Sequence, residues 1–172
     1  MITKELAAAA RRVLDACRSR GLKLATAESC TGGLVVAALT DIAGSSDVVD
    51  RGFVVYSNDA KEAMVGVPAA TLDAFGAVSR QTAEAMATGA LQRAEVDLAV
   101  AITGIAGPGG GTPTKPVGLV HFAAAARDGR LIRREQRYGD IGRSDVRVRS
   151  VIEALAMLEE LAASWRTPRE KS

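Results

Sequence analysis

The chain has 172 residues, 48% hydrophobic and 24% charged, which indicates a globular protein and excludes disordered and fibrous classes. This length suits one domain with a substantial core rather than two. The formal net charge of +2 is small and the basic residues do not interleave with aromatic ones, which argues against a nucleic-acid partner. We therefore expect a single domain over residues 1–166 and a frayed tail over 167–172.

The small numbers of cysteines and histidines and the short apolar runs limit which cellular compartment and which cofactors we expect. The two cysteines, Cys17 and Cys30, are too few for a disulfide scaffold, which favours a reducing, cytoplasmic environment. The one histidine, His121, has no accompanying cysteine or histidine cluster, so we predict no metal site. No apolar run is long enough to cross a bilayer, and we expect no membrane partner.

The first half of the chain predicts helices alternating with strands. Apolar residues at helical spacing between Leu6 and Cys17 predict an opening helix that ends at Gly21. Ser79 is expected to cap a later helix. The elements predicted between these two helices are, in chain order, a strand at 22–26, a helix at 31–39, a strand at 49–56 and short helices at 58–64 and 69–74.

The second half predicts a central strand, a hairpin and a closing helix. Residues 97–103 form an apolar run of the kind found in buried strands. Asp128-Gly129 between runs at 117–125 and 131–138 predicts an antiparallel hairpin. Apolar residues from Val146 to Trp165 predict the last helix. Because helices connect the early strands, we predict an α/β fold: a three-layer α/β/α sandwich with a mixed sheet of about five strands, then a C-terminal β-hairpin and helix.

Ser29 is the most informative position, because it follows the first predicted strand. In open α/β sheets ligands bind beyond the carboxyl ends of the strands. The backbone N–H groups of Thr31, Gly32 and Gly33 are expected to be free at the start of the next helix, where they can hold an oxyanion or another anion. The alternative is that Ser29 or Thr31 is simply the cap of that helix.

Cys30 is a rival nucleophile, intrinsically better than serine. Its usual partner is a histidine, but His121 lies on a predicted strand, which favours a serine activated by a lysine. Lys61 can act as that base only if its pKa falls well below about 10.4, and Tyr56 could relay the proton. The alternative for Lys61 is a solvated surface position.

The glycine-rich segment 103–111 is neither a P-loop nor a dinucleotide fingerprint. Its backbone N–H groups can converge on an anion, with Lys115 adding charge, or it can be a flexible connection. Arg143 and Arg147, four residues apart on the last helix, either reach a phosphate or face solvent. Glu28 is either a catalytic carboxylate or a hydrogen-bonding partner of the helix after Ser29.

Taken together, these motifs resemble the CinA C-terminal domain family, over nearly the whole chain. The matching stretches are Thr-Ala-Glu-Ser-Cys-Thr-Gly-Gly at 26–33, Arg-Gly-Phe-Val-Val-Tyr-Ser-Asn at 51–58 with Lys61, Gly-Ala-Val-Ser at 76–79, Thr-Gly-Ile-Ala-Gly-Pro-Gly-Gly at 103–110 and Lys-Pro-Val-Gly at 115–118. One departure lies before the last helix, where the Gly-Asp-Arg of the family is Gly-Asp-Ile-Gly-Arg at 139–143.

The resemblance implies a nicotinamide-nucleotide amidohydrolase, which converts nicotinamide mononucleotide into nicotinate mononucleotide and ammonia in pyridine nucleotide recycling. It gives Ser29 the role of nucleophile, Lys61 that of general base and Tyr56 an assisting role, without a metal or organic cofactor. The residues expected to bind the phosphorylated nucleotide are Glu28, Thr31, Gly32, Gly33, Asn58, Thr103, Gly104, Gly107, Gly109, Gly110 and Lys115.

Two alternative functions stay open at this point. One is an amidohydrolase for another phosphorylated amide, and the other is a nucleotide-binding module without catalytic activity. Alanine-rich helix faces and few aromatic residues fit tight packing and favour a homo-oligomer.

Overall fold

Six α-helices, five strands and one short 3₁₀ turn make up residues 2–167, the part of the chain that this computed structural model describes. The helices are α1 (Lys4–Arg18), α2 (Leu34–Thr40), α3 (Asn58–Val65), α4 (Ala69–Phe75), α5 (Arg80–Ala94) and α6 (Arg143–Ala163). The strands are β1 (Leu24–Glu28), β2 (Val49–Val54), β3 (Leu98–Gly104), β4 (Leu119–Ala126) and β5 (Leu131–Arg137). The 3₁₀ turn is η1 (Ser45–Asp47).

The strands form one mixed sheet in the order β2-β1-β3-β4-β5. β1 pairs in parallel with β2 on one side and β3 on the other, whereas β4 and β5 add antiparallel strands. After β1 the chain forms β2 on one side of that strand and later forms β3 on its other side. This reversal places a switch point, where ligands bind in open α/β sheets, at the carboxyl end of β1.

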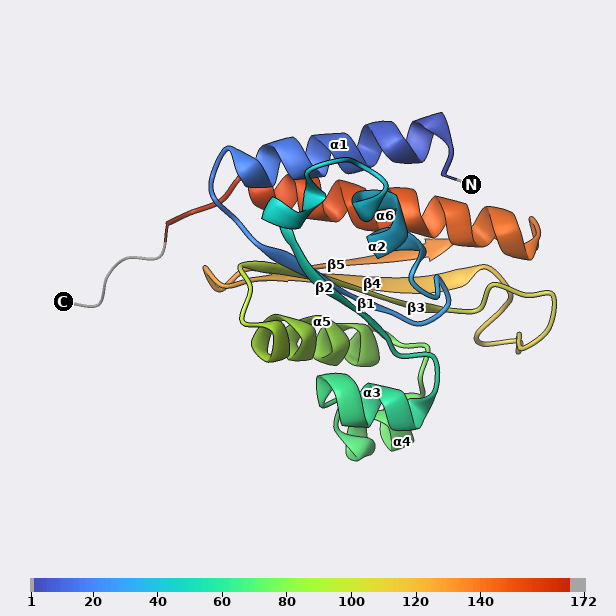
Figure 1. Ribbon diagram of the computed structural model, residues 1–172. Helices are drawn as coiled ribbons and strands as arrows, with labels where there is room; N and C mark the ends of the chain where they lie inside the picture. Colours follow the sequence, from blue (N-terminus) through green and yellow to red (C-terminus); the bar gives the residue numbers. More distant parts are fainter. Residues whose placement is uncertain (1, 168–172) are drawn as a thin grey trace.

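Helices cover both faces of the sheet, which gives three layers (Figure 1). α1, α2 and α6 pack on one face over a large core that includes Leu14, Leu98 and Phe122. α3, α4 and α5 lie on the other face, over a core built largely from alanines of the strands and Met86 of α5. The predicted α/β/α sandwich with a mixed five-stranded sheet and a C-terminal hairpin followed by a helix is confirmed.

The largest differences from the predicted boundaries surround Ser29. β1 continues to Glu28, two residues beyond the predicted strand end, because parallel pairing with both neighbours extends to that residue. α2 begins at Leu34 rather than at residue 31, because Gly32 and Gly33 have φ angles of +57° and +97°, which are incompatible with a right-handed helix. The two shifts leave Ser29 in a tight turn directly after the strand.

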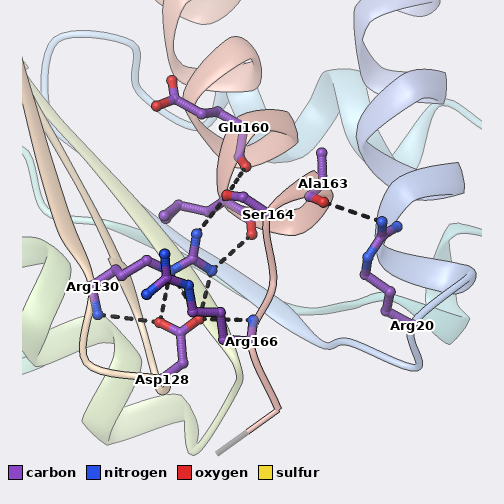
Figure 2. A network of polar contacts seen from close by, with 8 residues as sticks. Arg20, Asp128, Arg130, Glu160, Ala163, Ser164 and Arg166 are labelled. Atoms are coloured by element: carbon purple, nitrogen blue, oxygen red, sulfur yellow. Dashed lines mark hydrogen bonds and ion pairs between the residues drawn. The ribbon is translucent and has the colours of Figure 1, made fainter.

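Side-chain bonds tie the β4–β5 hairpin to the end of α6, as Figure 2 shows. The Asp128 carboxylate, whose side chain is only 2% exposed, accepts hydrogen bonds from the Arg130 guanidinium and from the Arg166 backbone N–H. Arg130 also donates to the Ser164 hydroxyl and to the Leu161 carbonyl. The turn residues therefore fix the position of α6, the helix whose other end reaches the carboxyl ends of the strands. Of the predicted tail, residues 168–172 lie outside the described part of the chain.

Within residues 2–167, no helix combines the length and the apolar character that crossing a membrane requires.

A glycine on α5 sets how closely α3 packs. A Cβ added at Gly89 would lie 1.7 Å from the Val65 carbonyl oxygen at the end of α3, a backbone atom that cannot move aside without moving the helix. The close approach of the two helices therefore requires glycine at this position. α3 also carries Lys61, so the same contact positions that side chain.

We predict that Gly89→Ala destabilises the protein by about 1–3 kcal/mol, as overpacking does, although alanine in place of glycine favours an isolated helix by about 1 kcal/mol. Urea unfolding measures the difference. The control is Gly109→Ala, where an added Cβ meets no atom within 4 Å and stability should not change. A Gly89→Ala protein as stable as the wild type would contradict the packing argument.

Candidate active site

A small cavity opens at the carboxyl ends of β1, β2 and β3, at the switch point of the sheet. Its volume is about 210 Å³. It is lined by Ser29, Cys30, Tyr56, Asn58, Lys61, Ala77, Val78, Thr103, Gly104, Ala106 and Arg143. The cavity therefore lies where the ends of three parallel strands meet α3, the segment before α5 and the first residue of α6.

Ser29 and Lys61 form a direct buried pair in it. The Lys61 ammonium nitrogen lies 3.2 Å from Ser29 Oγ and 3.1 Å from the Val55 carbonyl oxygen. Lys61 is 1% exposed and Ser29 8% exposed. No carboxylate within residues 2–167 lies at ion-pair distance from Lys61, so its hydrogen-bond acceptors there are uncharged. The surface position considered for Lys61 is therefore wrong.

Burial is the main cause that lowers the pKa of Lys61 below its ordinary value of 10.5. A charged amine loses hydration in this environment, whereas a neutral amine loses little. The neutral form has one lone pair and two N–H groups. When one N–H donates to the Val55 carbonyl, the lone pair can face Ser29 and accept its proton.

Cys30 lies beside this pair but is poorly suited to act as the nucleophile. Burial raises the pKa of its thiol to about 12, so the thiolate, the reactive form, is disfavoured. His121 lies in a different cavity from Cys30, beside Lys115 and Arg137. Cys30 therefore has no histidine partner in the described structure.

Glu28 holds the start of the helix that follows Ser29. Its fully buried carboxylate accepts hydrogen bonds from the backbone N–H groups of Gly33, Val35 and Val36 at 2.9–3.1 Å. Of the two roles considered for Glu28, the structure shows the hydrogen-bonding one. The carboxylate is itself the anion at this helix N-terminus.

The predicted anion site at the helix start is consequently wrong in part. The Gly33 N–H donates to Glu28, and the Gly32 N–H donates to the Ser29 carbonyl at 3.0 Å. Thr31 is fully buried and does not line the cavity. The Cys30 N–H, in contrast, makes no backbone hydrogen bond within residues 2–167, and Cys30 lines the cavity.

Tyr56 and Arg143 lie together at the exposed side of the cavity. Arg143 donates to the Tyr56 hydroxyl at 3.2 Å and to the Gly107 carbonyl at 2.9 Å, and thereby links the loop after β2 to the glycine-rich loop. Tyr56 is 63% exposed. Within residues 2–167 its hydroxyl makes no hydrogen bond to Lys61 or Ser29, so the geometry contains no proton relay through Tyr56.

The other residues predicted from the sequence divide into two groups. Asn58, Thr103 and Gly104 line the cavity together with Ser29 and Lys61. Gly107, Gly109, Gly110 and Lys115 do not line it. Lys115 donates to the Phe75 carbonyl at 2.6 Å and lines a separate cavity with Arg80 and Arg137.

Three further residues line the cavity without having been predicted as site residues: Ala77, Val78 and Ala106. Thr103 Oγ1 donates to the Ala77 carbonyl at 2.7 Å, which fixes the segment before α5 against the end of β3. Ala77 and Val78 belong to the Gly-Ala-Val-Ser stretch at 76–79, which resembles the family, and this resemblance is the sequence signal that could have indicated them. Within residues 2–167, no three side chains of His, Cys, Asp or Glu gather in a way that could hold a metal ion.

Comparisons with family models, curated proteins and solved structures all match this chain to proteins of the CinA type. The model of the CinA C-terminal domain family matches residues 6–162. A CinA-like protein of Mycolicibacterium gilvum is 58% identical over 138 residues, which cover 80% of this chain but only 32% of that protein. The chain thus spans about a third of the length of several curated relatives that it matches.

Two further matches cover most of both chains. A protein of Enterobacter agglomerans named nicotinamide-nucleotide amidohydrolase PncC is 49% identical over 141 residues, which cover 81% of this chain and 85% of that protein. The crystal structure of the competence/damage inducible protein CihA from Agrobacterium tumefaciens superimposes with a TM-score of 0.92 at 57% identity, covering 94% of this chain and 98% of the other.

We predict that Glu28→Gln destabilises the protein by roughly 1.5–3 kcal/mol, the usual contribution of a hydrogen bond to a charged group. A carboxamide carries one acceptor oxygen, so its NH₂ group would face at least one of the N–H donors of α2. Urea unfolding measures the loss, and Glu62→Gln, at an exposed position on α3, is the control. Equal losses in the two variants would contradict the role of Glu28.

The lowered pKa of Lys61 predicts how stability depends on pH. Between this pKa and the ordinary value of 10.5, the unfolded chain binds more protons at Lys61 than the folded protein does. The wild type should therefore gain stability relative to Lys61→Met as pH rises from neutral toward 10.5. Urea unfolding of both proteins across this window tests the prediction, and a difference that stays constant or changes in the opposite direction would contradict it.

Proposed function

The chain belongs to the CinA C-terminal domain family, and we therefore propose that it is an amidohydrolase that converts nicotinamide mononucleotide into nicotinate mononucleotide and ammonia. The name of the Enterobacter agglomerans relative, which the chain covers over 85% of its length, supports this reaction. The observation that carries the proposal is the buried contact between Lys61 and Ser29 inside a small cavity.

In the proposed mechanism Ser29 Oγ attacks the carboxamide carbon while its proton passes directly to the neutral Lys61 amine, which is already within hydrogen-bond distance. Lys61 then gives this proton to the departing ammonia. A water molecule then attacks the acyl-enzyme. Lys61 accepts a proton from this water and returns it to Ser29 Oγ as the ester bond breaks, which restores the serine hydroxyl and the neutral amine. The lowered pKa of Lys61 supports this role, because a base must be unprotonated before it can act.

The Cys30 N–H is our proposed donor to the oxyanion of the tetrahedral intermediate. It belongs to the residue after the proposed nucleophile. Cys30 lines the cavity, and its N–H makes no backbone hydrogen bond within residues 2–167. One such donor typically contributes about 3–4 kcal/mol to the stability of the transition state. The N–H groups of Gly32 and Gly33 cannot serve, because they are already bonded.

The size of the cavity suggests how the substrate lies. At about 210 Å³ it is smaller than the roughly 300–1,000 Å³ of sites that enclose a whole drug-sized ligand. We propose that it encloses the nicotinamide ring, while the ribose phosphate extends toward Arg143 and the glycine-rich loop. Tyr56, hydrogen-bonded to Arg143, then contacts the nucleotide at the opening of the cavity.

We also propose that residues 1–166 form one catalytic domain that acts in the cytoplasm as a homo-oligomer. Light scattering coupled to size-exclusion chromatography measures the number of subunits.

We predict that Ser29→Ala loses roughly 10⁴-fold or more in kcat for ammonia release from nicotinamide mononucleotide, as nucleophile substitutions do in other hydrolases. The loss is expected because no other described group at the cavity is both hydrogen-bonded to Lys61 and able to form an acyl intermediate. Coupled ammonia detection and chromatography of nicotinate mononucleotide measure the reaction.

The comparison variant is Cys30→Ala, which should lose far less, because its thiol is held protonated. Turnover that survives Ser29→Ala but not Cys30→Ala would transfer the nucleophile role to the cysteine. Nucleotide binding without turnover in the wild type would instead favour a binding module, and turnover of a different phosphorylated amide would correct the substrate.

A further inference from the structure

The turn that carries Ser29 is held by charged side chains that come from outside it. On its N–H side, the Glu28 carboxylate accepts hydrogen bonds from Gly33 and from the first turn of α2. The remaining polar groups of the turn include the carbonyls of Cys30 and Thr31. The Cys30 carbonyl has no backbone donor within residues 2–167. The Thr31 carbonyl accepts from the Leu34 N–H at the start of α2 and keeps a second lone pair, so both carbonyls can take side-chain donors.

Arg147 supplies those donors. From the second turn of α6, its Nε donates to the Cys30 carbonyl at 3.2 Å and its Nη2 to the Thr31 carbonyl at 3.1 Å. The guanidinium is planar and its N–H groups have a fixed spacing, so two such bonds fix both peptide groups at once. No carboxylate within residues 2–167 lies at ion-pair distance from Arg147, so its hydrogen bonds go to the nucleophile turn.

The orientation of these peptides matters for Ser29. The Cys30–Thr31 peptide is trans, so its plane is set once its carbonyl is held. That plane contains the Cα atom of Cys30, so holding it restricts the position of Ser29, which is joined to Cys30 through the two backbone torsions of Cys30. Ser29 Oγ must stay 3.2 Å from Lys61 Nζ, and Lys61 approaches from α3, on the opposite face of the sheet from α6. The turn is therefore held between two layers, with Lys61 on one side and Arg147 on the other.

We propose that Arg147 is a positioning residue for the proposed amide hydrolysis: it holds the backbone of the Ser29 turn so that the serine hydroxyl and the Cys30 N–H keep their alignment. It is not the group that receives the phosphate of the substrate. Its guanidinium is bonded to two backbone carbonyls, and Arg147 does not line the cavity. The reaction that Arg147 would assist rests on the proposed function. The geometry of the positioning role rests on the hydrogen bonds of Arg147 alone.

The test uses two variants and a matched control. Arg147→Met keeps the aliphatic stem and removes both donors, whereas Arg147→Lys keeps the charge but cannot reproduce the fork. Arg149→Met, at an exposed position on the same helix, is the control. Each protein is assayed with nicotinamide mononucleotide and with nicotinamide riboside, the same amide without its phosphate, after thermal melting has shown that it is folded.

We expect kcat of Arg147→Met to fall on the order of 10²-fold, as small misplacements of catalytic groups do, with KM unchanged and with the same fold-loss on both substrates. Arg147→Lys should show an intermediate loss in kcat, and Arg149→Met should match the wild type. Arg147→Lys also covers the case in which the methionine variant does not fold.

Two results would overturn the inference: full kcat in both Arg147 variants, or a rise in KM confined to the phosphorylated substrate, which would make Arg147 a phosphate ligand. If the wild type hydrolyses neither amide, the proposed function fails separately. The positioning role is then tested by a fluorophosphonate, in which Ser29 Oγ forms a bond to phosphorus, fluoride leaves and the serine proton passes to Lys61. Labelling of Ser29 in Arg147→Met should be slower than in the wild type, and an equal rate would overturn the inference.

Discussion

A buried lysine in contact with a serine is the feature on which the rest of the site depends. Burying an ammonium group is costly unless its hydrogen bonds are satisfied or its charge is given up. Lys61 has two neutral acceptors, Val55 and Ser29, and its pKa is lowered by burial. The fold therefore makes the charged form of Lys61 less favourable than it is in water, beside the serine whose proton it would accept. The close packing of α3 on α5 at Gly89 keeps it there.

The second constraint is the occupied helix N-terminus after Ser29. A free N-terminus would attract the phosphate of a nucleotide. Here the Glu28 carboxylate already fills that position, so this helix start fixes the turn and is not open to the phosphate of the proposed substrate. Glu28 on the N–H side and Arg147 on the carbonyl side together make the serine turn rigid. A rigid turn suits the proposed nucleophile, because Ser29 must stay within hydrogen-bond distance of the buried Lys61 side chain.

Much of the fold could be predicted from the sequence because its signals are local. The Asp128-Gly129 dipeptide between two apolar runs identified the hairpin, and Ser79 identified the N-cap of α5, where its hydroxyl accepts from the Thr82 N–H. That Ser29 and Lys61 lie close together could also be predicted, because each follows a strand whose carboxyl end lies at the same edge of the sheet.

The parts that sequence could not predict depend on partners far along the chain. Arg147 contacts residues 116 and 117 positions away, and Arg143 contacts Tyr56 across 87 positions. The helical spacing of these arginines does not reveal which backbone groups they meet. Lys115 was expected at the nucleotide site, but the loop carries it to the Phe75 carbonyl. The N–H groups of Gly32 and Gly33 were expected to be free, but Gly32 donates to the Ser29 carbonyl and Gly33 to the Glu28 carboxylate directly before the turn.

The most direct test of the account is a crystal structure of Ser29→Ala with nicotinamide mononucleotide bound. We expect the ring inside the cavity between Cys30 and Thr103, with its carboxamide carbon about 3–3.5 Å from the position that Ser29 Oγ occupies in the wild type. The Lys61 amine should remain within hydrogen-bond distance of that position. A nucleotide bound in another cavity, or a carboxamide turned away from residue 29, would contradict the central claim.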